Sequence, residues 1–164
     1  PVSKSLLKFV HIYELNEAYF IEMLDGMEMD LKFNRYENFK QLQLYCYRVA
    51  GVVGILSVKI LGFKNQGTLK YAHDLGIALQ LTNIIRDIGE DARKNRIYIP
   101  LDELKEFSVS EDEILKFKES NRVSGLIMHQ ITRAEVFYRN AYQKLPKEDI
   151  NPQIPGLIMG KIYE

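Results

Sequence analysis

The sequence predicts an all-α protein, and three observations lead to this class. Apolar residues recur every three or four positions along most of the 164 residues, which is the period of a helix with one buried face. Glycine, proline and asparagine interrupt the pattern where helices are expected to end. No stretch alternates polar and apolar residues between turn signals, as a half-buried strand would. We therefore expect helices and no sheet.

Four long helices are predicted, at residues 6–31, 39–61, 69–88 and 123–145. Gly62 ends the second of them, and Pro100 follows the third. Thr68 is a candidate N-cap for the third helix, because its hydroxyl could accept a hydrogen bond from a free backbone amide. Ser110 and Glu113 have the spacing of a capping box, which predicts a short helix after them.

Composition limits the classes of function. A chain that is 46% hydrophobic is long enough to form one domain with a core, here residues 1–164. The 22 basic and 22 acidic side chains cancel, so no overall field attracts nucleic acid or an anionic membrane. Cys46 is the single cysteine and cannot form an internal disulfide. No signal peptide and no apolar run long enough to cross a bilayer are seen, so we expect a cytoplasmic protein.

Residues 80–100, QLTNIIRDIGEDARKNRIYIP, place unusual charge behind an apolar run. Asn83, Asp87 and Asp91 follow each other at intervals of four residues, so on a helix they fall within about 80° of arc. Carboxylate and amide oxygens in such a stripe suit Mg²⁺, which also takes phosphate oxygens from a ligand. Three arginines lie within ten residues of these carboxylates and could hold phosphate: Arg86, Arg93 and Arg96.

On spacing alone, this stripe has two interpretations. It is either a metal and diphosphate site or a solvated face with ion pairs one turn apart. Gly89 costs about 1 kcal/mol relative to alanine in a helix, which is easier to understand if another group approaches the backbone there. The three histidines are dispersed without ligand spacing, so no zinc site is predicted: His11, His73 and His129.

Two blocks of the sequence resemble a known family. LGIALQLTNIIRDIGEDARKNRIYIPLDEL, at 75–104, resembles the second aspartate-rich motif of the squalene/phytoene synthases, and YCYRVAGVVGILSVKILG, at 45–62, resembles the tyrosine-containing helix of that family. FIEMLDGMEMDL, at 20–31, and PQIPGLIMGKIYE, at 152–164, also follow it. The amino-acid sequence of these segments most resembles bacterial presqualene-diphosphate and squalene synthases and phytoene synthases. The resemblance implies part of an isoprenoid-synthase-type helical bundle.

The resemblance also implies roles for individual residues. The magnesium ligands would be Asn83, Asp87 and Asp91, and the diphosphate-contacting arginines would be Arg86 and Arg96. Polar groups near the substrate would be Tyr45, beside the departing diphosphate and the carbocation, Gln80 in the cavity, and Tyr163 near the diphosphates. The helix that closes around a prenyl chain would present Val49, Ala50, Gly51, Val53 and Gly54. Small residues spaced in this way also often mark close helix packing, and that alternative stays open.

The implied reaction is a magnesium-dependent condensation of two prenyl diphosphates through their C1 ends. We predict farnesyl diphosphate as substrate, leading to presqualene diphosphate and squalene, in preference to geranylgeranyl diphosphate and phytoene. NADPH would be needed if squalene is the final product. An apolar product makes peripheral membrane contact an expectation. Chain length should be set two to four turns from the aspartates, by residues that face each other on two helices: Ala78, Leu75 and Ala72 on one, and Val53 with Leu56 or Val58 on the other.

Completeness and alternatives remain open at this point. The family uses two aspartate-rich motifs, but D-x-x-x-D occurs once here, at residues 87–91, and the chain starts without methionine. We therefore expect a missing N-terminal half or a homo-oligomer, and no activity from this chain alone. One rival is a non-catalytic relative that serves as a binding or assembly protein, although such relatives have generally lost the metal ligands. Another is a plain helical interaction domain with a solvated acidic stripe.

Overall fold

The computed structural model describes residues 2–164, which form helices joined by turns, with no strand among them. The α-helices are α1 (Val2–Ile12), α2 (Glu17–Lys32), α3 (Phe39–Cys46), α4 (Val52–Leu61), α5 (Gly67–Arg86), α6 (Ile88–Arg93), α7 (Leu101–Glu106), α8 (Glu111–Leu115), α9 (Asn121–Lys144) and α10 (Ile154–Tyr163). A π-helical turn, η1 (Tyr47–Gly51), joins α3 to α4, and a 3-10 turn, η2 (Lys147–Asp149), follows α9. The all-α prediction is confirmed.

The first predicted helix is wrong in one respect, because residues 6–31 form two helices. Asn16 separates them, and its side chain accepts a hydrogen bond from the amide of Ala18 at 2.9 Å, which caps the start of α2. The predicted capping box is confirmed: Ser110 and Glu113 satisfy each other's backbone amides at the start of α8. Helix periodicity therefore located the apolar faces, whereas capping decided where one helix became two.

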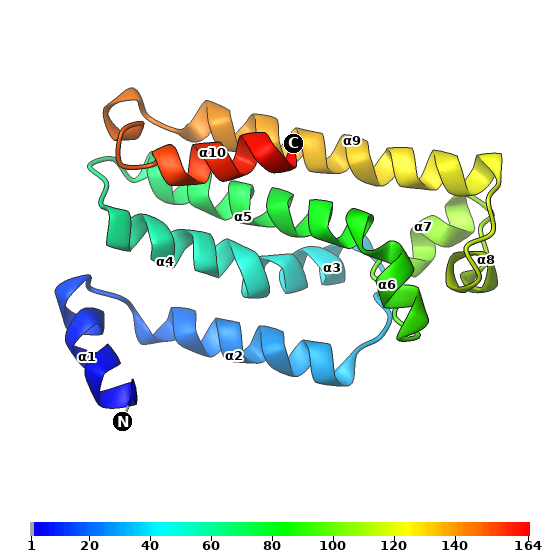
Figure 1. Cartoon of the computed structure of the whole chain (residues 1–164), viewed down its shortest axis with the longest axis horizontal. Coiled ribbons are helices and arrows are strands. Elements are labelled where there is room, and N and C mark those ends of the chain that lie inside the picture. Colours follow the sequence, from blue (N-terminus) through cyan, green and yellow to red (C-terminus); the bar gives the residue numbers. More distant parts are fainter. Residues whose placement is uncertain (1) are drawn as a thin grey trace.

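Helix α5 occupies the middle of the bundle, and its neighbours cover it on several sides (Figure 1). Helix α9 packs along one side of α5, α4 with η1 packs along another, and α10 returns beside it. Helix α2 lies on the far side of η1 and α4. This central position explains why α5 buries Tyr71, Leu75, Ile77 and Leu81, which point in different directions around the helix.

Two glycines let η1 and α4 approach α5 with almost no side chain between them. A Cβ atom on Gly76 would lie 2.5 Å from the carbonyl oxygen of Ala50, and one on Gly54 would lie 2.5 Å from that of Ala72. Both distances are shorter than van der Waals contact, so a side chain at either position would push the helices apart. The π-helical turn lies at this crossing, as such turns often do near functional sites.

One helix has the length and composition of a membrane span, which differs from the expectation from the sequence, because the chain is continuously helical from Phe39 to Leu61 through η1. Its 23 residues have a mean hydropathy of 1.6, which is long and apolar enough to cross a membrane by length and composition alone. The helix packs against α2 on one side and α5 on the other, as a core helix does.

A buried carboxylate, Asp149, fastens the connection between α4 and α5. It accepts hydrogen bonds from the backbone amides of Lys64 at 2.8 Å and Asn65 at 2.9 Å, and from the Thr68 hydroxyl at 2.6 Å. Thr68 was predicted to cap α5, but the helix begins at Gly67 and the threonine donates to Asp149 instead. Burial alone would raise the pKa of Asp149, but these hydrogen bonds outweigh burial and lower the pKa below its usual value.

We expect Asp149→Asn to lower the melting temperature at neutral pH by several degrees, because an amide cannot accept all three hydrogen bonds. Since the folded-state pKa is depressed, this stabilisation is present above the ordinary aspartate pKa and is lost as the pH falls through the folded value. The gap in melting temperature between wild type and variant should therefore narrow below about pH 4. Glu148→Gln, at an exposed neighbour, is the matched control. A gap that does not change with pH would contradict the account.

Candidate active site

The polar segment lies where α5 ends and α6 begins. Asp87 separates the two helices, with φ −98° and ψ 8°, so the predicted single helix is interrupted there. The helical path nevertheless continues, because the amide of Asp87 donates to the carbonyl of Asn83 at 2.9 Å and the amide of Asp91 donates to that of Asp87 at 2.9 Å. Asn83, Asp87 and Asp91 therefore stay on successive turns.

Two of these three side chains offer free oxygen atoms in partly dry surroundings. The side-chain oxygen of Asn83 is buried and accepts no hydrogen bond within the described chain, which is unfavourable for an isolated acceptor. Asp91 is half-buried, and burial first, then the nearby charge of Asp87, raises the pKa of its carboxyl. A cation placed between them would satisfy the amide oxygen and reverse the repulsion.

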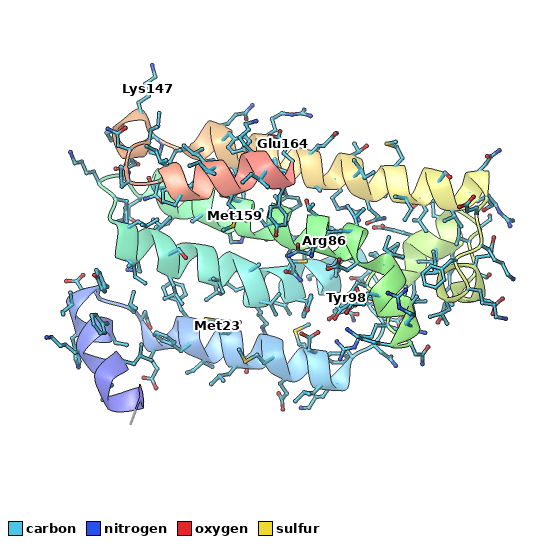
Figure 2. The ribbon with its side chains drawn as sticks, viewed as in Figure 1. Met23, Arg86, Tyr98, Lys147, Met159 and Glu164 are labelled. Carbon is cyan, nitrogen blue, oxygen red and sulfur yellow. The ribbon has the colours of Figure 1, made fainter. Side chains whose placement is uncertain are left out.

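The third ligand candidate, Asp87, is paired with an arginine. Arg86 donates from Nε and Nη2 to the two carboxylate oxygens of Asp87, both at 2.8 Å. These hydrogen bonds lower the pKa of Asp87. The guanidinium of Arg86 also lies 5.8 Å from the ring centroid of Tyr163, so the end of α10 meets the end of α5 (Figure 2).

The chemistry of this donor set fits Mg²⁺ held together with a phosphorylated ligand. Within residues 6–164, no three His, Cys, Asp or Glu side chains gather into a metal cluster. Mg²⁺ does not need such a cluster, since it commonly takes one or two carboxylates, waters and substrate phosphates. Asp87, Asp91 and Asn83 would supply two carboxylates and one amide oxygen. The Asp87 carboxylate accepts two hydrogen bonds from Arg86 and keeps further lone pairs for a metal.

A second group of polar side chains surrounds Asp30 of α2. Its carboxylate accepts hydrogen bonds from the Tyr45 hydroxyl at 3.1 Å, the Tyr98 hydroxyl at 2.9 Å and Nη1 of Arg96 at 3.2 Å. Tyr45 is buried, and its ring packs against those of Tyr36 and Tyr98, with centroids 5.4 Å away in each case. Burial raises the pKa of the Tyr45 hydroxyl, which therefore acts as a donor.

An apolar cavity of about 540 Å³ lies between α4 with η1, α5 and α10. This volume is typical of a small-molecule site. Five of the residues predicted to face a substrate line it: Val49, Ala50, Val53, Gly54 and Gln80. Asn83 also lines it, at the end of α5 that leads to the aspartates. Gly51 does not line it and instead packs against α5, where a Cβ would lie 3.6 Å from the carbonyl oxygen of His73.

The residues predicted to set chain length divide between two environments. Ala72, Leu75, Val53 and Val58 line the cavity. Ala78 instead packs into the core beside α9, and Leu56 packs against Leu15 and Val52. A helix has 3.6 residues per turn, so residues three apart, such as 72, 75 and 78, point in different directions around the axis. Distance from the aspartates along the helix therefore did not identify which residues line the cavity.

Gly89 has a local explanation. A Cβ atom there would lie 2.9 Å from Cε1 of Phe117, which reaches α6 from the turn after α8. The group that approaches the backbone at this glycine is therefore a side chain of the same protein. This contact leaves the substrate interpretation of Gly89 without support.

Residues 1–164 match the family model described as "Squalene/phytoene synthase". The chain belongs to this family. The fold resembles the crystal structure of squalene synthase HpnC from Alicyclobacillus acidocaldarius, with a TM-score of 0.87 over 98% of this chain and 62% of that chain. At 21% identity, this likeness shows the fold alone. A dehydrosqualene synthase structure is 30% identical, with a TM-score of 0.77 over 89% of this chain and 52% of its own.

Curated relatives of this squalene/phytoene synthase chain are phytoene synthases. The protein from an Oncidium hybrid cultivar is 45% identical over 74% of this chain and 31% of its own length. The protein from Arthrospira platensis is 42% identical over 84% of this chain and 49% of its own length. The chain thus spans less than half of the relatives that it matches.

Sequence reasoning missed three parts of this squalene/phytoene synthase site. Asp30 stands within a segment that was matched to the family, but nothing local indicated that it would face Arg96. Tyr98 follows Arg96 by two residues and was read only as part of the motif. The cavity wall from α10 includes Gly156 and Met159, whose contribution depends on how that helix folds back.

Proposed function

We propose that this chain forms part of an enzyme that condenses two prenyl diphosphates through their C1 atoms with the help of Mg²⁺. The observation that carries the proposal is a juxtaposition: an apolar cavity reaches Gln80 and Asn83, and the next turn of the same helical path carries Asp87. From Tyr71 to Asn83 the cavity follows thirteen residues of α5, which is about 18 Å of helix. A long apolar chain with a charged head group fits such a site.

Each group would have a separate task. Asn83, Asp87 and Asp91 would hold Mg²⁺, which when bound withdraws charge from the leaving diphosphate. Arg86 and Arg96 would bind the diphosphate oxygens and stabilise the charge that develops as the bond to C1 breaks. The double bond of the second chain then attacks C1, and a proton is lost as the cyclopropane closes. The apolar walls would keep water from the carbocation.

Tyrosines would act at the same end of the cavity. Tyr163 lies beside Arg86 and would contact a diphosphate, whereas Tyr45 is buried and directs its hydroxyl at Asp30. We therefore propose that Tyr45 acts near the leaving group through the Asp30 group and not from the cavity wall.

We propose that further polypeptide completes the site. Apolar side chains are exposed at intervals on α2 and α10: Ile21, Leu24, Leu31, Ile154, Ile158 and Ile162. Such faces are usually covered in a folded protein, and relatives contain more sequence than this chain spans. A second aspartate-rich motif from that sequence, or a second copy of the chain, would supply the missing ligands, and this chain alone should be inactive. Retention of Asn83, Asp87 and Asp91 favours an enzyme over an assembly protein.

Phytoene formation from geranylgeranyl diphosphate is the product class that we favour, because the curated relatives are phytoene synthases. Squalene formation from farnesyl diphosphate is the second candidate, and it would require NADPH. Its basis is the resemblance of the sequence segments to presqualene-diphosphate and squalene synthases. The plant relatives carry "chloroplastic" in their names. We propose that this protein lies in an aqueous compartment and contacts a membrane when it releases its product.

A competition assay tests the product class. The intact gene product is incubated with Mg²⁺ and equimolar farnesyl and geranylgeranyl diphosphates, and the extracted products are analysed by mass. We expect mainly the product built from two C20 chains. A mainly C30 product would transfer the assignment to squalene synthesis, whereas no product from metal-loaded protein would favour the assembly-protein alternative.

Filling the cavity should shorten the accepted chain. We expect Val53→Phe to lower kcat/KM for geranylgeranyl diphosphate about tenfold more than for farnesyl diphosphate, because one added ring displaces several methylenes of substrate. Val136→Phe on α9 is the matched control, since Val53 and Val136 are each 41% exposed and only Val53 lines the cavity. Equal effects of the two substitutions on both substrates would contradict the placement of the chain.

A further inference from the structure

Asp30 connects three segments that are far apart in the sequence. It lies two residues before the end of α2, and its carboxylate accepts hydrogen bonds from Tyr45 of α3 and from Tyr98. Arg96 approaches it twice: Nη1 donates to the carboxylate at 3.2 Å, and Nη2 donates to the backbone carbonyl of Asp30 at 2.7 Å. Within residues 6–164, the other hydrogen-bond partner of this guanidinium is Tyr98, whose hydroxyl accepts from Nη1 at 2.9 Å.

These contacts fix Arg96 next to the candidate metal ligands. The backbone amide of Arg96 donates to the carbonyl of Asp91 at 2.9 Å, and the two side chains line the same small crevice. The guanidinium is thus held beside the site although its carboxylate partner comes from another helix.

We propose that Asp30 is a positioning residue, which orients Arg96 to bind the diphosphate. The inference rests on the proposed function. A free arginine side chain loses much rotamer freedom when it binds a ligand, so an arginine that is already fixed binds with a smaller entropy loss. The charge of Asp30 by itself repels an anion, so orientation and charge predict opposite results when the carboxylate is removed.

Titration calorimetry with inorganic pyrophosphate and MgCl₂ separates the effect of orienting Arg96 from the effect of the Asp30 charge. If Asp30 orients Arg96, Asp30→Ala should weaken pyrophosphate binding about tenfold through the restored freedom of the arginine. Unchanged or tighter binding would overturn the proposal. Asp25→Ala is the matched control, because Asp25 lies on the same helix and pairs with Arg48 at 2.9 Å, away from the site. It should bind pyrophosphate as wild type does.

A double-mutant cycle tests whether Asp30 acts through Arg96. In an Arg96→Ala background, Asp30→Ala should have no further effect on pyrophosphate affinity, whereas an equal loss in both backgrounds would show a general structural role and overturn the proposal. Thermal melting checks that each variant is folded. If Asp30→Ala melts below the assay temperature, the isosteric Asp30→Asn is used, and a smaller loss of the same sign is expected.

The binding readout also keeps this inference separate from the proposed function. Loss of pyrophosphate affinity that depends on Arg96 supports the positioning role whether or not the intact gene product couples prenyl diphosphates. In another outcome, wild type couples prenyl diphosphates while Asp30→Ala keeps unaltered pyrophosphate binding and activity. That result would leave the proposed function intact and overturn the role of Asp30.

Discussion

Replacing Asp87 and Asp91 together by asparagine is expected to weaken magnesium-dependent binding of pyrophosphate by about a hundredfold or more, because both anionic ligands are lost while the shape is kept. Calorimetric titration of pyrophosphate with and without Mg²⁺ measures the effect. In the intact gene product, coupling of prenyl diphosphates should fall at least as far, since charge on the leaving group would no longer be neutralised.

The same variant should fold. Burial raises the pKa of Asp91, which means that its charge is unfavourable in the metal-free fold, so the neutral asparagine should not lower the melting temperature there. At Asp87 the variant loses an exposed ion pair with Arg86, and such surface pairs contribute little to stability. Glu90→Gln is the matched control, because Glu90 lies between the two aspartates in sequence and pairs only with Lys94, at 2.6 Å on the surface. Equal pyrophosphate affinity with magnesium in the double variant and wild type would rule out the metal site.

The second large effect concerns packing. Gly76→Ala is expected to destabilise the protein by about 3 kcal/mol, because the new methyl group would lie 2.5 Å from the carbonyl oxygen of Ala50 and 2.8 Å from Cα of Gly51. Both are backbone atoms, so the clash cannot be relieved by a side-chain rotation. The helices would have to separate, and the cavity between them would change shape. Urea unfolding measures the loss.

Gly125→Ala on α9 is the matched control for this substitution. The nearest atoms to a Cβ there belong to the Phe107 ring at 3.6 Å, which is ordinary contact, so alanine should stabilise the helix by up to about 1 kcal/mol. Opposite signs for the two glycines are therefore expected. If Gly76→Ala proved as stable as Gly125→Ala, the close approach of η1 to α5 would not be needed by the fold.

The sequence by itself determined the local features of this protein. Apolar periodicity located most of the helices, and the continuous 39–61 helix was predicted with its observed limits. The spacing of Asn83, Asp87 and Asp91 placed them on successive turns even though the helix breaks at Asp87. These features depend on residues within one or two turns of each other, and the 3.6-residue period is enough to relate such residues.

Tertiary structure decided the rest, because contacts between distant segments depend on how closely and at what angle helices cross. Arg96 and Asp30 are 66 residues apart in the chain, and neither segment carries a local signal for their pairing. The cavity depends on the fold-back of α10 and on the backbone approach at Gly54 and Gly76. Periodicity reports which face of a helix is apolar, but only packing decides whether that face fills a core or lines a cavity.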